Sequence, residues 1–273
     1  MPIPWAEWPR RARLAKLAVV TYDVPDPDLM EHARSLIEEA KRITVLTGAG
    51  ISTDSGIPDF RGPQGVWTRN PGAEKRATIQ NYVADRDIRV AAWRNRLDSR
   101  TWSAEPNDSH RALVRLERKG KLRSLLTQNV DGLHHAAGSA PERIVEIHGS
   151  VRNVGCLSCS YEAPMSVALD RIRGGEDDPE CPECGGILKS TTISFGQSLV
   201  SEDIERAQVA AHECDLMLTI GTTLGVYPIA GVVPIAAGRG APVIIVNGEP
   251  TEMDHLAEVV VRGAIGQILP ELW

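Results

Sequence analysis

Two continuous apolar runs in the carboxyl-terminal half of the chain constrain the fold most strongly. They are "DLMLTIG" (215–221) and "APVIIVNG" (241–248), and each ends in glycine and polar residues. Apolar runs without polar alternation are typical of parallel strands that are buried on both faces of a sheet. A similar run, "ITVLTG", starts at Ile43 after a helical pattern over 28–42. The sequence therefore predicts an α/β fold built on a Rossmann-type parallel sheet.

Two segments interrupt this pattern and predict a smaller inserted domain. Residues 62–104 are rich in Arg, Asn and Trp, with helical spacing around 85–98, and residues 151–190 contain paired cysteines. We expect the sheet domain to comprise 28–61, 105–150 and 191–273, and the smaller domain to combine a helical module with a cysteine module. Further helices are expected at 107–120, 202–213 and 227–237, and strands at "LRSLLT" and "RIVEI". Polar loops then follow five strands at one sheet edge, where ligands bind in open α/β sheets.

Composition sets limits on the class of protein. The chain has 273 residues, 42% of them hydrophobic and 24% charged, with a formal net charge of -6. This charge argues against general nucleic-acid binding. No apolar run approaches the roughly 18 residues of a membrane span. The basic stretch 10–16 lacks the apolar segment of a secretion signal, so we expect a solvated helix face rather than a targeting signal, and a cytoplasmic protein without membrane partners.

Four of the five cysteines form two C-x-x-C pairs with 21 residues between them. This spacing lies just beyond the usual ~15–20 residues of paired zinc knuckles. Four thiolates complete a tetrahedral Zn²⁺ shell and leave no open position for catalysis, so a structural zinc ion is expected. The alternative is a redox dithiol or unpaired thiols. The predicted ligands are Cys156, Cys159, Cys181 and Cys184, and Cys214 is expected in the core.

The loops after the predicted strands carry the candidate chemistry. Gly48-Ala49-Gly50, between a strand and an expected helix, lets backbone N–H groups approach a diphosphate, but it also suits a plain tight turn. Gln128, Asn129 and Asp131 can bind ribose hydroxyls or a carboxamide, or form an Asx turn that caps the next helix. His148 follows a strand at the same edge, where a neutral imidazole suits a general base. A lone histidine is more often structural.

The ordered set of these motifs resembles the sirtuins, the NAD-dependent protein deacylases. The matching stretches run from about Asp28 to Leu272: "GAGISTDSGIPDFRG", "TQNVDGLH", "HGS", the C-x-x-C pairs, "ISFGQSL", "GTTLGVYP", "VNGEPTEMD" and "VVRGAIGQILPEL". The resemblance implies a deacylase that transfers the acyl group of acyl-lysine to ADP-ribose and releases nicotinamide. It also implies NAD and a structural zinc ion as bound groups, and an acyl-lysine protein or peptide as the substrate.

The resemblance assigns roles to individual residues. His148 would be the general base, and Asn129 and Asp131 would place the nicotinamide ribose and a water molecule. Phe60 would shield the reactive ribose carbon. The implied NAD-binding residues are Gly48, Ala49, Gly50, Ile51, Asp59, Phe60, Arg61, Trp67, Gln128, Asn129, Asp131, His148, Gly221, Thr222, Thr223, Asn247, Glu249 and Ala264. The substrate peptide would pair as a strand with Phe195-Gly196 and Gly225-Val226-Tyr227.

Two departures from the family pattern bear on specificity. Gln197 stands where the family usually has Glu, which changes the charge near the substrate channel. One branch that removes succinyl and malonyl groups carries Tyr-x-x-Arg, and the nearest equivalent here is Trp93-x-x-Arg96. Arg96 could pair with an acyl carboxylate, but we expect a surface arginine, and acetyl is the default acyl group. The rival functions are a mono-ADP-ribosyltransferase or NAD glycohydrolase, a non-enzymatic NAD sensor or scaffold, and a zinc-ribbon nucleic-acid binder.

Overall fold

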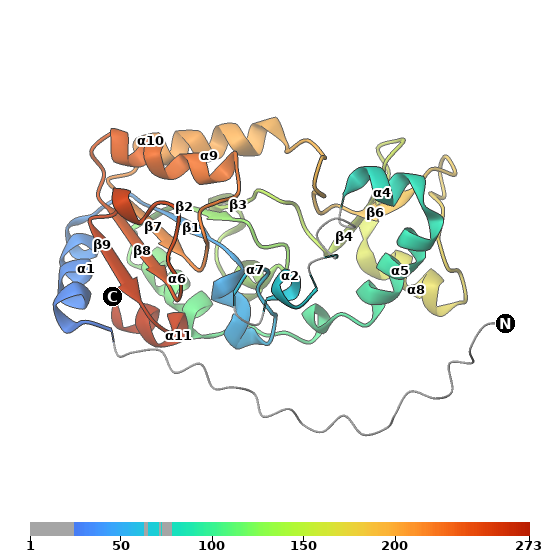
Figure 1. Ribbon diagram of the computed structural model, residues 1–273. Coiled ribbons are helices and arrows are strands. Elements are labelled where there is room, and N and C mark those ends of the chain that lie inside the picture. Colours follow the sequence, from blue (N-terminus) through green and yellow to red (C-terminus); the bar gives the residue numbers. More distant parts are fainter. Residues whose placement is uncertain (1–24, 63–64, 71, 73–77) are drawn as a thin grey trace, which may run out of the picture.

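A six-stranded parallel sheet forms the centre of the described part of the chain, residues 25–62, 65–70, 72 and 78–273 of this computed structural model (Figure 1). The strand order is β3-β2-β1-β7-β8-β9, and all five neighbouring pairs are parallel. The strands are β1 (Ile43–Thr47), β2 (Leu122–Thr127), β3 (Ile144–Glu146), β7 (Leu216–Ile220), β8 (Val243–Asn247) and β9 (Val259–Arg262). The predicted α/β fold is confirmed. The basic stretch 10–16 lies outside the described residues.

The three apolar runs form central strands, as predicted. Every residue of β1, β7 and β8 is buried. Helices cover both faces of the sheet, which explains why neither face alternates with polar residues. The sequence analysis missed β9, because this short edge strand has only two fully buried positions.

One helical layer contains α1 (Pro27–Glu39), α6 (Asp108–Arg118) and α11 (Ile265–Ile268), whose buried residues share one core with the sheet. The opposite layer contains α9 (Ser201–Glu213) and α10 (Val232–Gly238) (Figure 1). Helix α6 begins as predicted, with a capping box between Asn107 and His110. Gly120 follows its last turn with φ +73°. Cys214 is buried in the second core, as expected.

The two interrupting segments pack together beside the sheet. The first contributes α2 (Val66–Arg69), α4 (Ile79–Ala84) and α5 (Arg86–Leu97). The second contributes the antiparallel strands β4 (Asn153–Cys156), β5 (Glu162–Pro164) and β6 (Leu188–Ser190), together with α8 (Met165–Arg173). Trp93 of α5 is fully buried in a core that also contains Val154, Leu169 and Leu188. A third core therefore joins segments that are distant in sequence.

Shorter elements complete the fold. Helix α7 (Leu133–Ala137) follows β2. The helix expected beside Gly48-Ala49-Gly50 is present, but as a 3₁₀ helix, Ala49–Ser55. The tighter turn ends at Gly56 with φ +80°, a conformation that glycine adopts without strain. The remaining 3₁₀ turns are Arg100–Trp102, Pro141–Arg143, Ile229–Gly231, Asp254–Leu256 and Leu269–Glu271. Among the described residues, no helix is long and apolar enough to cross a membrane.

Candidate active site

Two glycine loops meet at the carboxyl edge of the sheet. The Gly48 amide donates to the Ile220 carbonyl, and the Gly50 amide donates to the Gly221 carbonyl, both at 2.9 Å. A Cβ atom on Gly50 would lie 2.7 Å from the Gly221 Cα, and Gly221 has φ +65°. Only glycine allows this approach between the β1 and β7 loops. The crossing lies at the carboxyl end of β1, which has β2 on one side and β7 on the other. Doubly wound sheets bind nucleotides at positions of this kind.

The loop after β2 places two polar side chains beneath this crossing. Asn129 Nδ2 donates to the Gly48 carbonyl and to Ser52 Oγ, each at 3.1 Å. Ser52 Oγ donates to Asp131 Oδ2 at 2.8 Å. Asp131 Oδ1 also accepts from the Leu133 amide at 2.9 Å, which is the predicted Asx turn at the start of α7. The β1 and β2 loops are therefore joined by a buried hydrogen-bond network.

His148 follows β3 at the same edge of the sheet. Its Nδ1 lies 3.0 Å from the Gln128 carbonyl oxygen. Because a carbonyl can only accept, Nδ1 carries the proton and Nε2 keeps its lone pair. Burial lowers the pKa of His148, although the bond to Gln128 opposes this shift. The net shift of the pKa is downward, so the imidazole is neutral at pH 7 with a free basic nitrogen, as the chemistry of a general base requires.

Phe60 and Trp67 of α2 form a row of aromatic side chains with Phe195. The Phe60 and Trp67 rings lie 4.7 Å apart, and the Trp67 and Phe195 rings lie 5.4 Å apart. The Arg61 guanidinium lies 4.4 Å from the centre of the Trp67 ring. Burial raises the pKa of Asp59, the Gly62 amide lowers it, and Glu249 raises it further. Trp67 thus contacts Phe195, a predicted substrate residue.

Two of the predicted NAD residues, Arg61 and Thr223, border an open hollow. Its cavity volume is about 450 Å³, within the size range of ligand sites, and Arg61, Thr223, Gly225, Pro250, Thr251 and Glu252 line it. Gln128 Nε2 donates to Thr222 Oγ1 at 2.9 Å. Asn247 Nδ2 donates to the Glu249 carbonyl at 2.7 Å. Ala264 precedes α11, which contacts the 3₁₀ turn that contains Ile51.

The predicted peptide-binding residues belong to no named strand. Phe195 makes an isolated bridge with Thr78, and its carbonyl accepts from the Ile79 amide at 3.0 Å. Gly196 has φ +79°. Tyr227, which follows Gly225 and Val226, is 65% exposed. The pairing of these two segments with a peptide stays a prediction. Gln197 Oε1 accepts from the Ser194 amide, so this side chain also bonds within its own loop.

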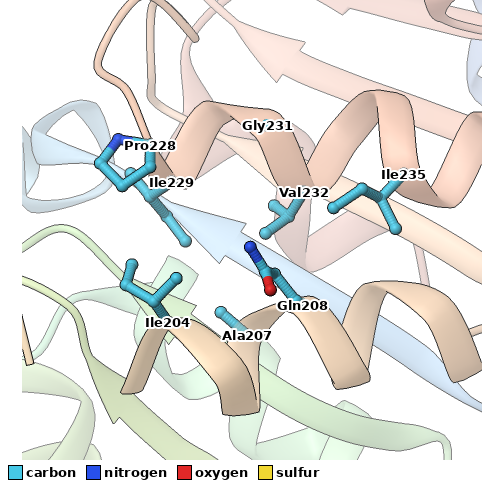
Figure 2. Close-up of a pocket in the computed structure, with 8 residues that line it drawn as sticks. All are labelled: Ile204, Ala207, Gln208, Pro228, Ile229, Gly231, Val232 and Ile235. Atoms are coloured by element: carbon cyan, nitrogen blue, oxygen red, sulfur yellow. The ribbon is translucent and has the colours of Figure 1, made fainter. Parts of the chain in front are cut away.

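A smaller hollow lies between α9 and α10 (Figure 2). Its cavity volume is about 40 Å³, too small for a nucleotide. Apolar side chains line most of it, and Gln208 is the polar one among them. No titratable side chain lines it. It therefore lacks the chemistry of an active site.

The four paired cysteines converge in the smaller unit. Their sulfur atoms all lie within 4.8 Å of one another. The Cys156 and Cys184 sulfurs are 3.5 Å apart, and those of Cys159 and Cys181 are 3.6 Å apart. Zinc–sulfur bonds of about 2.3 Å in a tetrahedron put sulfurs about 3.8 Å apart. The cluster fits a structural zinc ion.

Arg96 differs from the expected surface arginine. Its Nη2 donates to Ser190 Oγ at 2.9 Å, while Nη1 is buried without a hydrogen-bond partner. Burial lowers the pKa of Arg96. Lys189, also buried, donates to the carbonyls of Ser190 and Thr192, and burial lowers its pKa to about 8. Neither cation has an acidic partner within 4 Å in the described part of the chain.

Sequence reasoning missed several polar residues beneath the site. Ser52 joins Asn129 to Asp131, and Thr47, Thr127, His110 and His134 lie below the same loop. Thr47 and Thr127 each end a predicted strand. Their position at the sheet edge could have identified these two threonines as part of the site.

Comparisons with known proteins agree with this geometry. A sequence model of the Sir2 family matches residues 48–228. The chain is 46% identical to NAD-dependent protein deacetylase 2 of Streptomyces coelicolor, covering 84% of this chain and 95% of that protein. It is 39% identical to an NAD-dependent protein deacylase of Thermococcus kodakarensis, covering 89% and 94%. A solved complex of Sir2 with a p53 peptide and NAD⁺ superposes with a TM-score of 0.78 at 30% identity, covering 88% of this chain and 95% of that one.

Proposed function

The chain belongs to the Sir2 family, and we propose that it is an NAD-dependent protein lysine deacylase. It transfers the acyl group of acyl-lysine to ADP-ribose and releases nicotinamide. The observation that carries this proposal is the arrangement of His148. Its imidazole presents an unprotonated Nε2 at the same sheet edge as Asn129, Asp131 and the two glycine loops. A protein that only binds NAD has no need of this base.

The residues at the sheet edge fit NAD. The glycine crossing keeps side chains away from the β1 and β7 loops, and the hollow beside Thr223 has room for part of a dinucleotide. When bound, NAD supplies a ribose carbon that becomes electrophilic as nicotinamide leaves. We propose that the following residues hold it: Gly48, Ala49, Gly50, Ile51, Asp59, Phe60, Arg61, Trp67, Gln128, Asn129, Asp131, His148, Gly221, Thr222, Thr223, Asn247, Glu249 and Ala264.

The chain's own residues then have distinct tasks. His148 accepts a proton at Nε2 from a ribose hydroxyl, while the Gln128 carbonyl holds Nδ1–H and fixes the ring. Asn129 and Asp131 orient the ribose, because their side chains are already held by Ser52. Phe60 and Trp67 exclude water from the reacting carbon, since water there would replace acyl transfer by hydrolysis. Phe195-Gly196 and Gly225-Val226-Tyr227 bind the substrate peptide as a strand.

The zinc ion has a structural task in this proposal. Cys156, Cys159, Cys181 and Cys184 hold it, and four thiolates leave no coordination position open for substrate. We propose the domain boundaries that were expected from the sequence, with 62–104 and 151–190 as the inserted smaller domain. A cytoplasmic location would keep these thiols reduced.

The acyl group has two candidates. Acetyl remains the default, and several relatives are named as deacetylases. An acyl group that ends in a carboxylate is the second, because Arg96 is a buried cation without an acidic partner in the described chain. Arg96→Met is then expected to lower kcat/KM for a succinyl peptide by about tenfold relative to an acetyl peptide. Arg94→Met on the exposed face of α5 serves as the matched control.

The test of the proposed function uses the purified protein with NAD and lysine peptides that carry acetyl, propionyl or succinyl groups. Peptide mass and nicotinamide are followed together, with His148→Ala alongside. We expect NAD-dependent deacylation that His148→Ala reduces by more than about a hundredfold. Nicotinamide release without deacylation would favour a glycohydrolase or an ADP-ribosyltransferase. NAD binding without any reaction of these peptides would favour a sensor.

A further inference from the structure

Two buried histidines lie directly beneath the loop that carries Asn129 and Asp131. His110 of α6 and His134 of α7 are 0% and 2% exposed, and their ring centres are 4.9 Å apart. Burial lowers the pKa of His110 to about 4 and the pKa of His134 well below 6.5. Both rings are therefore neutral at pH 7. The proposed reaction gives neither of them a task.

The hydrogen bonds of His134 have a defined direction. Its Nε2 lies 3.0 Å from Thr47 Oγ1, and Thr47 Oγ1 donates its single proton to Thr127 Oγ1 at 2.9 Å. Thr47 can therefore only accept from His134, which places the imidazole proton on Nε2. Thr127 Oγ1 also accepts from the Asn129 amide at 3.1 Å. These bonds link His134 through two threonines to the backbone of Asn129, and Thr127 Oγ1 accepts from both Thr47 and Asn129.

These hydrogen bonds tie together the two ends of one backbone loop. Residues 127–134 begin at Thr127 and end at His134, and Thr47 of the neighbouring strand β1 joins the two ends through its side chain. The Thr47 carbonyl also accepts from the Gln128 amide at 3.0 Å. Within this closed segment lie Asn129 and Asp131. Small displacements of groups that orient a substrate lower catalytic rates strongly.

We infer that His134 is a positioning residue, which acts through Thr47 and Thr127 to hold Asn129 against the ribose of bound NAD. His110 packs against the His134 ring and keeps its orientation. The inference rests on the proposed function for the identity of the ligand. The direction of the hydrogen bonds is independent of that function.

The test compares three valine or serine variants of buried threonines on β1. Thr47→Val removes the central hydroxyl, and Thr47→Ser restores it. Thr44→Val is the matched control, because Thr44 is equally buried on the same strand but donates to the Ala210 carbonyl at 2.9 Å, on the α9 side. We expect Thr47→Val to lower kcat by about tenfold with little change in the KM of the acyl peptide. Thr47→Ser should stay within about twofold of the parent, and Thr44→Val should lose stability but keep kcat.

Two results would overturn the inference. One is a Thr47→Val variant with the parent's kcat, or a Thr44→Val variant that loses as much activity as Thr47→Val. The other comes from nitrogen-15 NMR of histidine in the parent protein, where the Nδ1–H tautomer of His134 would contradict the direction of the chain. The NMR result stands even if the protein deacylates no peptide. Loss of the proposed function and loss of this inference are therefore distinguishable.

Discussion

The ion pair between Arg89 and Asp178 joins the helical segment to the cysteine segment, and its removal is predicted to loosen the smaller unit. Arg89 Nε lies 2.9 Å from Asp178 Oδ2, and both side chains are only 13% exposed. Arg89 Nη1 also donates to the carbonyls of Tyr82 and Val83. Asp178 lies in the turn three residues before Cys181. The pair therefore links α5 to a proposed zinc ligand.

Asp178→Ala leaves the Arg89 guanidinium buried without its carboxylate. Breaking a buried pair in this way costs about 3–5 kcal/mol. The two carbonyls remain as acceptors for Arg89, so we expect a cost below this range, about 2–3 kcal/mol. For a chain of this size, that lowers the unfolding temperature by roughly 5–8 °C. Trp93 lies in the core that joins the helical segment to the cysteine segment, so its fluorescence reports the unfolding of the smaller unit.

The neighbouring residue provides the control. Arg94 Nη2 lies 3.0 Å from Asp177 Oδ1, but these side chains are 66% and 53% exposed. Asp177→Ala should cost less than about 1 kcal/mol, as exposed ion pairs do. In the double variant Arg89→Met, Asp178→Ala, most of the stability should return, because no buried charge is left unpaired; Arg86, the other partner of Asp178, is 61% exposed. Equal effects of Asp177→Ala and Asp178→Ala, or additive effects in the double variant, would refute the reasoning.

Three further predictions concern the zinc site and the titrating groups. Cys181→Ser should abolish binding of one zinc ion per chain, measured by elemental analysis, and lower the unfolding temperature; a variant that keeps its zinc would exclude this cysteine as a ligand. The pKa of His148 is lowered by burial, so kcat/KM should fall as the pH drops through a value below 6.5; a midpoint above 7 in the pH profile would count against His148 as the base. Burial, aided by Asp131 and Asp203, raises the pKa of Glu146 from 4.5 to about 7, so the folded state holds a proton that the unfolded state loses between those values. Stability from this group therefore declines as the pH rises from 4.5 to 7, and Glu146→Gln should stabilise the protein at pH 8 but not at pH 4.5 in urea titrations.

The sequence predicted the centre of the fold because burial on both faces leaves a clear pattern. Strands β1, β7 and β8 read as unbroken apolar runs, and each is fully buried. Strand β9 was missed, since it is a short edge strand with mixed burial. The 3₁₀ form of the helix at Ala49–Ser55 was not predicted. This form depends on the close crossing with Gly221, which local sequence does not reveal.

The partners within the site could not be predicted from spacing along the chain. Thr47 and Thr127 are 80 residues apart, and Ser52 and Asp131 are 79 residues apart. Only the parallel pairing of β1 with β2 brings them together. Arg96 was expected at the surface because arginine usually lies there. Arg96 follows Trp93 by three residues on the same helix, so its place on the buried face of α5 could have been predicted.

The proposed function depends above all on the role of His148 in acyl transfer to ADP-ribose. The most direct measurement quantifies free lysine peptide, nicotinamide and O-acyl-ADP-ribose by mass spectrometry in one reaction of the purified protein. We expect equal amounts of the three products, and their joint loss in His148→Ala. Nicotinamide in excess of deacylated peptide, with ADP-ribose in place of the acylated product, would contradict the proposed function.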